Sequence, residues 1–379
     1  MSRSSLRHAL SVAVCALLIF ALSIAMPLSE KNEFSERENR ALSLFPTLSI
    51  KSLASGDFSR RLSDFYSDQF PLRSLWLSLK ASIERLMGAQ ELGGILLGKD
   101  GYLIPRNEYD DLLVARNNLT ACRAFLDRMT DAGIPTTVAI APRPIDALSA
   151  YLPALYDPTR ASAIYGPIHN TLPEAVDLTT PLREAADGGA SVFYHTDHHW
   201  TTDGAYLSYT KLAPALGIEP LPKEDFSRVT MSHDFLGTSY SATGLLSWDT
   251  PDQIVLYRYE GDARMTVCVV ETGEAFSGFY REEYLEQKDQ YRIFLGGNYA
   301  HLSIRNPDVP ELPTLLLIKD SFSNSLIPFL SRHFQLEVID PRYVTESVAE
   351  QIIALSPDQV LLLWGADTLA TNPSLRKLN

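Results

Sequence analysis

The sequence predicts an α/β fold that is built on a parallel sheet and carries a β-rich insertion and an N-terminal membrane helix. Short apolar segments at 315–319, 336–339 and 360–364 are typical of strands that are buried on both faces. Segments with helical periodicity separate them, and this alternation is typical of a parallel sheet covered by helices. An uncharged stretch at 9–26 precedes the whole pattern.

The uncharged stretch at 9–26 predicts where the protein resides. At about 1.5 Å per residue, a helix of this length just spans a hydrocarbon layer of about 30 Å. Arg3 and Arg7 precede it, so the N-terminus is expected inside and the main domain outside the cytoplasm. We predict a signal anchor over 1–27 and a single-pass protein of the cell membrane. The alternatives are a signal peptide cleaved near 23–25, which would give a secreted protein, and a buried N-terminal helix.

The remaining chain is expected to form a stem and one α/β domain. Residues 28–48 are polar and mixed without a clear period, and we assign them to the stem. Residues 49–379 are assigned to the domain, whose β-rich insertion covers about 222–305, where short alternating segments occur. Periodicity predicts helices at 50–70, 72–87, 112–129, 162–171, 323–334 and 344–355. It predicts a hairpin at 95–104 and strands at 136–141, 175–178, 191–195, 315–319, 336–339 and 360–364.

Composition argues against several classes of function. Apolar residues make up 45% of the chain, which is enough for a full core and argues against global disorder. Lys and Arg number 33 against 46 Asp and Glu, giving −13, and no basic run occurs, so a nucleic-acid partner is not expected. The three cysteines include no CxxC pair, which argues against a structural zinc site. We predict no cofactor.

The segment YHTDHHWTTD at 194–203 concentrates side chains that could carry out chemistry. If it is extended, its side chains alternate in direction. His195, Asp197 and His199 would then share one face, and His198 would point the other way. A carboxylate beside an imidazole can fix the tautomer of the ring. The segment is therefore a candidate for general acid–base catalysis.

Two other interpretations of this segment remain open. The donor types of His195, Asp197, His199 and Asp203 suit a divalent metal, although no HExxH spacing is present. The cluster could also be a hydrogen-bonded structural feature at a helix start, because Thr201 or Thr202 followed by Asp203 is typical of an N-cap and first turn.

A second candidate is KDSFSNS at 319–325, where a predicted buried strand ends and a helix begins. A serine in such a turn projects from the carboxyl edge of the sheet, and nearby N–H groups face an anion position. Ser321 would then be a nucleophile in a turn like a nucleophile elbow, although the GxSxG form is absent. The alternative is that Asp320, Ser321 and Ser323 only cap the helix.

Two weaker signals accompany these motifs. The paired glycines of Gly296-Gly297-Asn298 let a backbone approach a ligand closely, and the amide of Asn298 offers a donor. A plain turn is the alternative for this loop. A rival serine, Ser239, lies in GTSYS at 237–241, but no long buried strand precedes it.

These motifs resemble the sequence blocks of the DHHW protein family. HTDHHWTTDGAY resembles its signature, and FLGGNY at 294–299, IKDSFSNSLIPFL at 318–330 and DPRY at 340–343 resemble its later blocks. FSERENRALSLFP, DQFPLRSLWLSLK and LLGKDGYLI in the stem and first helices also match. The resemblance therefore covers nearly the whole chain after the anchor.

The DHHW family is similar to the SGNH-hydrolase-like proteins that acetylate alginate outside the cytoplasmic membrane. The resemblance implies a three-layer α/β/α fold in which Asp197-x-His199 takes the Asp-x-His role and Ser321 that of the nucleophile. Lys319-Asp320 departs from the usual Gly-rich block around that serine. The resemblance further implies a polysaccharide acceptor and a multi-pass membrane acyltransferase that supplies acyl groups.

Together, the residues and the resemblance predict a membrane-anchored, extracytoplasmic O-acyltransferase that transfers acetyl groups to a cell-surface or secreted polysaccharide. Ser321 would attack the acyl carbonyl, His199 would act as the base, and Asp197 would orient His199. The residues assigned to the oxyanion site or to substrate contacts are Gly297, Asn298, His198, Trp200 and Arg342. The alternatives are an acetyl esterase acting on glycans, a non-catalytic glycan-binding or assembly protein on the same fold, and a metal-dependent hydrolase.

Overall fold

The computed structural model describes residues 40–345 without a gap, followed by 347–348, 352 and 354–379; before residue 40 it describes 31–35 and scattered positions between 8 and 29. Half of the uncharged stretch at 9–26 thus lies outside the described residues. Among those described, no helix is long and apolar enough to cross a membrane. The chain divides into two compact units, one of residues up to Ala89 with Gly244–Ser247 and one of the remainder. The predicted domain boundaries at 27 and 48 stay predictions.

The larger unit is built on a seven-stranded sheet with the strand order β10-β9-β11-β13-β12-β14-β6. Its strands are β6 (Thr136–Ala141), β9 (Thr266–Val269), β10 (Glu274–Ser277), β11 (His301–Arg305), β12 (Thr314–Lys319), β13 (Gln335–Ile339) and β14 (Gln359–Gly365). The neighbours β13, β12, β14 and β6 run parallel, whereas β11, β9 and β10 pair antiparallel. The predicted parallel sheet is confirmed for these four strands, and the fold is mixed α/β.

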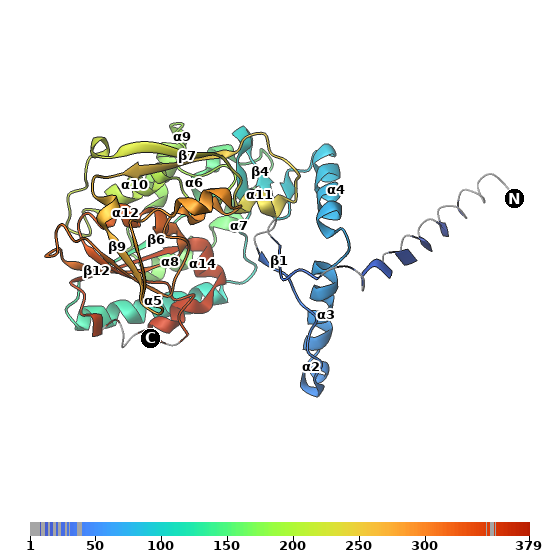
Figure 1. Cartoon of the computed structure of the whole chain (residues 1–379), viewed down its shortest axis with the longest axis horizontal. Helices are drawn as coiled ribbons and strands as arrows, with labels where there is room; N and C mark the ends of the chain where they lie inside the picture. Colours follow the sequence, from blue (N-terminus) through green and yellow to red (C-terminus); the bar gives the residue numbers. More distant parts are fainter. Residues whose placement is uncertain are drawn as a thin grey trace. The chain divides into compact units, whose positions relative to one another are not determined.

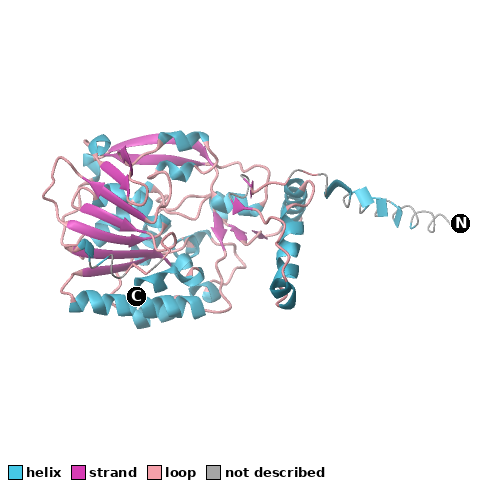
Figure 2. Ribbon diagram, turned by 60° about the horizontal axis from the view of Figure 1, so that its bottom comes forward, coloured by secondary structure: helices cyan, strands magenta, loops and turns pink. Residues whose placement is uncertain are grey.

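Helices pack against both faces of this sheet (Figures 1 and 2). One face is covered by α5 (Leu113–Asp131), α8 (Tyr165–Thr171), α14 (Ala366–Thr371) and the 3₁₀ helix η8 (Pro373–Leu378). The other is covered by α6 (Pro144–Ala147), α9 (Thr179–Asp187), α10 (Thr202–Leu212) and α12 (Ile327–Leu330). Within β12, Leu316 and Ile318 are buried on the face covered by α5, and Leu315 and Leu317 are buried on the face covered by α10. This two-sided burial explains why the strand is apolar at every position from Leu315 to Ile318.

Shorter strands form two further sheets in the larger unit. β3 (Glu91–Leu92), β4 (Ile95–Leu97) and β5 (Leu103–Pro105) form one, in which the hairpin predicted at 95–104 is confirmed. β7 (Ser227–Phe235) and β8 (Asp252–Arg258) form the other. The region predicted as a β-rich insertion is thus split, because β9, β10 and β11 extend the central sheet. Their alternate residues, such as Val267 and Leu302, are buried in the core shared with the parallel strands.

Three of the elements predicted for the larger unit are wrong. The segment predicted as a strand at 191–195 is irregular and makes one isolated pair, between Phe193 and Trp200. The strand predicted at 175–178 is reduced to a single bridge with β6. The helix predicted at 323–334 is a 3₁₀ helix, η7 (Ser321–Ser325), followed by α12, which has Pro328 in its first turn, where a missing N–H costs nothing. The helix predicted at 344–355 lies partly outside the described residues.

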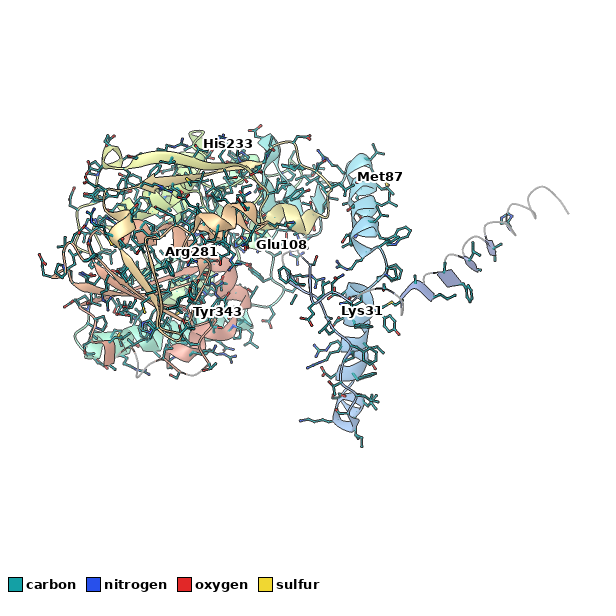
Figure 3. The ribbon with its side chains drawn as sticks, viewed as in Figure 1. Lys31, Met87, Glu108, His233, Arg281 and Tyr343 are labelled. Carbon is teal, nitrogen blue, oxygen red and sulfur yellow. The ribbon has the colours of Figure 1, made fainter. Side chains whose placement is uncertain are left out.

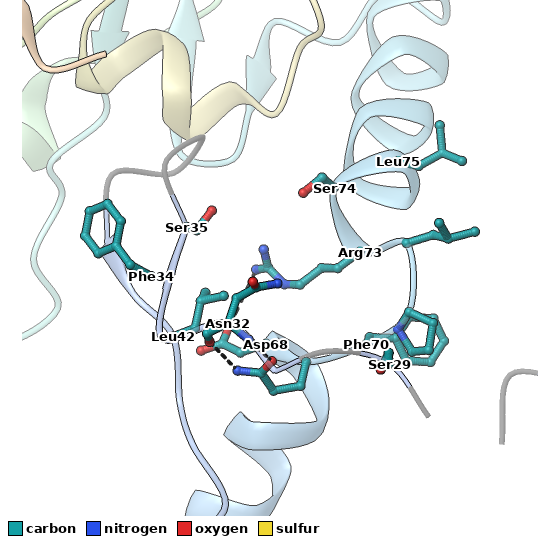
Figure 4. A pocket seen from close by; sticks show the side chains of 13 residues that line it. Ser29, Asn32, Phe34, Ser35, Leu42, Asp68, Phe70, Arg73, Ser74 and Leu75 are labelled. Atoms are coloured by element: carbon teal, nitrogen blue, oxygen red, sulfur yellow. Dashed lines mark hydrogen bonds and ion pairs between the residues drawn. The ribbon is translucent and has the colours of Figure 1, made fainter. Parts of the chain in front are cut away.

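The smaller unit contains three helices, α2 (Ile50–Ala54), α3 (Asp57–Asp68) and α4 (Arg73–Leu86), and the two-residue strands β1 (Phe34–Ser35) and β2 (Arg40–Ala41). The helix predicted at 50–70 is broken at Gly56, whose φ of 75° lies in the left-handed region. Figure 4 shows the pocket where α3 ends and α4 begins, which is lined by Asn32, Asp68 and Arg73 among others. There Gln69 Nε2 donates to Asn32 O (2.8 Å), and Asn32 N–H donates to Gln69 Oε1 (3.1 Å).

Candidate active site

Ser321 lies directly after β12, at the carboxyl edge of the parallel strands. Asp320 fixes this turn because its carboxylate accepts from the N–H of Phe322 (3.1 Å) and from the N–H of Gly365 (2.8 Å), at the end of the adjacent strand β14. Position 365 suits glycine, since a Cβ there would lie 2.8 Å from Asp320 Oδ2. Ser321 is half-buried, whereas the rest of η7 is buried. The strand end therefore presents one serine to the surface.

Asp197 and His199 form a hydrogen-bonded chain with this serine. His199 Nε2 lies 2.9 Å from Ser321 Oγ, and His199 Nδ1 lies 2.6 Å from Asp197 Oδ1. The His199 backbone N–H also donates to Asp197 Oδ1 (3.0 Å). Asp197 and His199 are buried. With Nδ1 protonated toward the carboxylate, Nε2 is free to accept the Ser321 proton.

The predicted alternation of side chains along 195–199 is wrong, because this segment bends instead of extending. Asp197 and His199 meet through a local turn closed by the Asp197 carboxylate on the His199 N–H. His198 does not point away, since its ring lies 3.9 Å from that of His199, centroid to centroid. His195 turns elsewhere: its ring stacks on Tyr102 at 4.0 Å.

The four predicted metal donors are not brought together. His195 Nδ1 lies 3.1 Å from Asp252 Oδ1, and Asp203 accepts from Lys223 at 2.6 Å. A different set, Asp197, His198 and His199, offers three ligand atoms within 4.8 Å of one another. In His199, Nδ1 is hydrogen-bonded to Asp197 and Nε2 to Ser321, so a cation bound by this ring would compete with those bonds.

Three further residues support the site and were not predicted from the sequence. Thr238 donates to Asp197 Oδ2 from its N–H and from its hydroxyl, both at 2.8 Å. Gly237 precedes it, and a Cβ there would lie 2.4 Å from Asp197 Oδ2. The ring of Tyr291 stacks on His199 with centroids 4.0 Å apart and an angle of 7°. The GTSYS motif was the available signal for the first two, and no local pattern marks Tyr291.

The GTSYS motif contributes the hydrogen bonds from Thr238 to Asp197. Its first serine, Ser239, is not part of the hydrogen-bonded chain from Asp197 through His199 to Ser321. Ser239 is buried, and its hydroxyl has no hydrogen-bond partner among the described residues. Of the two serines considered as nucleophiles, only Ser321 has its hydroxyl on His199. The structure therefore favours Ser321 over Ser239.

Burial and neighbouring charge set the protonation of the chain. Burial opposes ionisation of Asp197, but the charges of His198 and His199 and hydrogen bonds to the carboxylate lower its pKa well below the ordinary value. Burial and, after it, the charge of His198 lower the pKa of His199 to about 4, although Asp197 acts in the opposite direction. His199 is therefore neutral at neutral pH, the form that accepts a proton.

The other predicted site residues surround a buried cation. Lys319 Nζ donates to Asn298 Oδ1 and to Asn324 Oδ1, both at 2.7 Å, and lies 3.6 Å from Asp340 Oδ2. Burial lowers the pKa of Lys319 to about 8, although Asp340 raises it. Arg342 donates from Nε (2.9 Å) and Nη2 (2.7 Å) to the Asp340 carboxylate. The Lys319 at which this sequence departs from the Gly-rich block thus shares the Asp340 counter-ion with Arg342.

The roles predicted for Gly297, Asn298, Trp200 and Arg342 stay predictions. The Gly297 carbonyl accepts from Asn324 at 3.4 Å, and the Asn298 oxygen is engaged by Lys319. Trp200 is fully buried, and its Nε1 donates to Ser325 Oγ at 3.0 Å, so it packs beneath η7. Of the predicted substrate contacts, His198 is beside the imidazole chain and half-exposed, and its Nδ1 lies 2.7 Å from Thr238 Oγ1.

The fold and this geometry define an α/β protein with a serine, a histidine and an aspartate in one hydrogen-bonded chain at the carboxyl edge of a mostly parallel sheet. The family model of the DHHW protein matches residues 185–339. This region includes Asp197, His199 and Ser321, and its match to the DHHW family model agrees with the resemblance that the sequence motifs predicted.

Curated relatives are probable alginate O-acetylases named AlgJ. The protein of Pseudomonas fluorescens is 26% identical over 180 residues, which cover 45% of this chain and 46% of that protein. The protein of Pseudomonas syringae pv. tomato is 26% identical over 202 residues, 51% of each chain. The chain therefore spans about half the length of the curated relatives it matches, and the relationship is distant.

Solved structures show the same fold. A DHHW family protein from Eubacterium siraeum superimposes with a TM-score of 0.65 at 20% identity, over 76% of this chain and 95% of that chain. Bacillus cereus PatB1, solved alone and with a sulfonyl adduct, gives a TM-score of 0.60 at 19% identity, over 74% of this chain and 98% of that chain. At these identities the likeness concerns the fold.

Proposed function

We propose that this protein is a serine-type O-acyltransferase that moves an acetyl group to a hydroxyl of a polysaccharide outside the cytoplasm. The observation that carries the proposal is the unbroken chain from Asp197 through His199 to Ser321, with links of 2.6 and 2.9 Å. These distances lie in the range that proton transfer between a base and a nucleophile requires. The relation to probable alginate O-acetylases supports acetyl as the acyl group.

In the first half-reaction, Ser321 Oγ attacks the carbonyl carbon of the acyl donor while His199 Nε2 takes the hydroxyl proton. Asp197, ionised because its pKa is lowered, stabilises the resulting imidazolium. The tetrahedral intermediate collapses, the donor alcohol leaves with the proton from His199, and an ester remains on Ser321. The Ser321 N–H is a candidate donor to the oxyanion, with Gly297 and Asn298 as the other predicted contributors.

In the second half-reaction, an acceptor hydroxyl attacks the serine ester, and His199 takes its proton and returns it to Ser321 Oγ. A sugar hydroxyl gives transfer, whereas water gives hydrolysis, so an acetyl esterase would use the same residues. A membrane acyltransferase that supplies the acetyl group, and a location on the outer side of the membrane by way of the N-terminal segment, remain part of this proposal.

The proposal is tested by labelling the full chain with a fluorophosphonate and locating the adduct by peptide mass spectrometry. We expect one adduct on Ser321, lost in His199→Ala, because the hydroxyl depends on the imidazole for its reactivity. A folded chain that takes no label would overturn the proposal in favour of a glycan-binding protein. Turnover that a chelator abolishes without affecting labelling would favour the metal-dependent hydrolase. Acetylated alginate oligosaccharides, formed from p-nitrophenyl acetate, would distinguish transfer from hydrolysis.

The pH dependence of turnover provides an independent prediction. Since His199 must be neutral to act as the base and its pKa is lowered to about 4, kcat/KM should be constant near neutral pH and fall as the pH drops through about 4. The charge of His198 contributes to this lowering, so His198→Gln should move the acid limb to higher pH. The measurement is the pH profile of p-nitrophenyl acetate turnover above the uncatalysed rate.

A matched control for His198→Gln is His233→Gln, because His233 is exposed on β7 (Figure 3). This second variant should retain the acid limb of the unmodified protein. An acid limb that stays in place in His198→Gln would contradict the electrostatic coupling between the two adjacent imidazoles.

A further inference from the structure

Helix α4 turns its apolar side to solvent. Six residues that recur at helical spacing are between 41% and 88% exposed, and we call them the α4 stripe: Leu72, Leu75, Trp76, Leu79, Ile83 and Leu86. The buried residues of the helix are the small Ser78 and Ala81. Figure 4 shows Leu75 on the side of α4 opposite Ser74. A helix of a soluble domain normally buries its apolar stripe, so this arrangement leaves the stripe uncovered by the part of the chain that the structure describes.

The sequence segment that contains α4 differs in charge from the rest of the chain. Residues 40–89 contain seven basic and four acidic residues, whereas the whole chain carries −13. Lys80 and Arg85 lie on α4 itself. A basic segment with an exposed apolar face is suited to a surface that is both anionic and apolar, and phospholipid membranes have both properties.

The position of α4 in the chain points to the same surface. The stretch at 9–26, which the sequence predicts to enter a membrane, lies fewer than fifty residues before the helix. α4 has 14 residues and is therefore about 21 Å long, too short to cross a hydrocarbon layer of about 30 Å. A helix of this length with one apolar face can lie in the interface, where tryptophan is enriched.

We propose that the α4 stripe is a membrane-docking surface that lies in the interfacial layer of an anionic bilayer. Leu75, Leu79 and Ile83 would reach the acyl-chain boundary, Trp76 would lie at the headgroup level, and basic side chains would remain among the headgroups. This contact is additional to the N-terminal segment and does not depend on the proposed acyl transfer.

The test uses the full chain reconstituted into vesicles of phosphatidylcholine and phosphatidylglycerol with brominated acyl chains, which quench tryptophan fluorescence at short range. Trp76 is the tryptophan on the stripe; of the other three, Trp200 and Trp364 are fully buried and Trp248 is half-buried, so the signal of Trp76 is taken as the difference from Trp76→Phe. We expect quenching that is largely lost in Trp76→Phe. Because the N-terminal segment can hold every variant on the vesicle, the signal reports the position of the stripe.

A double variant, Leu79→Glu with Ile83→Glu, should reduce quenching of Trp76 by charging the stripe. Leu155→Glu is the matched control, since Leu155 is 88% exposed in the larger unit and lies outside the stripe. Circular dichroism checks that each variant is folded. The proposal is overturned if Trp76 is quenched by aqueous iodide and not by brominated lipid. Shielding of Trp76 from both quenchers would overturn it in favour of a protein partner or a second copy of the chain.

Discussion

Ser321→Ala is expected to lower p-nitrophenyl acetate turnover by about a thousandfold or more and to leave the fold intact. The hydroxyl is the group that His199 Nε2 contacts at 2.9 Å, and its loss removes the nucleophile. The side chain is half-buried and small, so its truncation opens no large cavity. Steady-state kinetics together with circular dichroism measure the two effects separately.

Two other buried serines provide controls for this variant. Ser323 lies in the same 3₁₀ helix, and Ser239 is the rival serine of the GTSYS motif; both hydroxyls are buried without a hydrogen-bond partner among the described residues. Alanine at either position should leave turnover close to that of the unmodified protein. If Ser321→Ala retains turnover, or if Ser239→Ala loses it, the assignment of the nucleophile is wrong.

The second large effect is expected on stability, in Asp340→Ala. Asp340 is fully buried and is the carboxylate that faces Arg342 at 2.7 and 2.9 Å and Lys319 at 3.6 Å. Its removal leaves two cations close together without this counter-ion. Breaking a buried ion pair from one side costs roughly 3–5 kcal/mol, so we expect the free energy of unfolding to fall by about that amount. Urea unfolding followed by circular dichroism measures the change.

Asp308→Ala is the matched control for this effect, because Asp308 pairs with Arg264 on the surface, where both side chains are well exposed. Exposed pairs contribute little to stability, so its unfolding midpoint should hardly move. Asp340→Asn keeps the shape of the side chain and two of its acceptor sites. Its unfolding midpoint should therefore lie between those of Asp340→Ala and Asp308→Ala. Equal midpoints for Asp340→Ala and the unmodified protein would show that the buried cluster does not stabilise the fold.

The central strands of the fold could be predicted from the sequence because their signal is local. The runs at 315–319, 336–339 and 360–364 are apolar at nearly every position, which only two-sided burial explains, and β12, β13 and β14 occupy them to within a residue or two. The wrong predictions concern segments whose conformation depends on residues distant in the sequence. Residues 191–195 have strand-like composition, but β-pairing requires a neighbouring strand, and only Phe193 has such a partner.

The site was partly predictable for the same reason. The pattern Asp-x-His and a serine after a buried strand are short motifs, and the structure brings Asp197, His199 and Ser321 together. The local geometry was predicted incorrectly, since a turn and not a strand joins Asp197 to His199. Thr238 and Tyr291 approach from segments far along the chain; the GTSYS motif contains Thr238, whereas no local pattern marks Tyr291.

The sequence by itself determined the parallel core, the two motifs that contain Asp197, His199 and Ser321, and the relation to the DHHW family. Those features depend on side chains close together in the chain or on periodic burial. Only the tertiary structure decided that β9–β11 extend the central sheet, that Lys319 and Asp340 neutralise each other, and that α4 presents its apolar side to solvent. These outcomes depend on contacts between residues distant in sequence, whose burial and pairing energies appear only when the chain is folded.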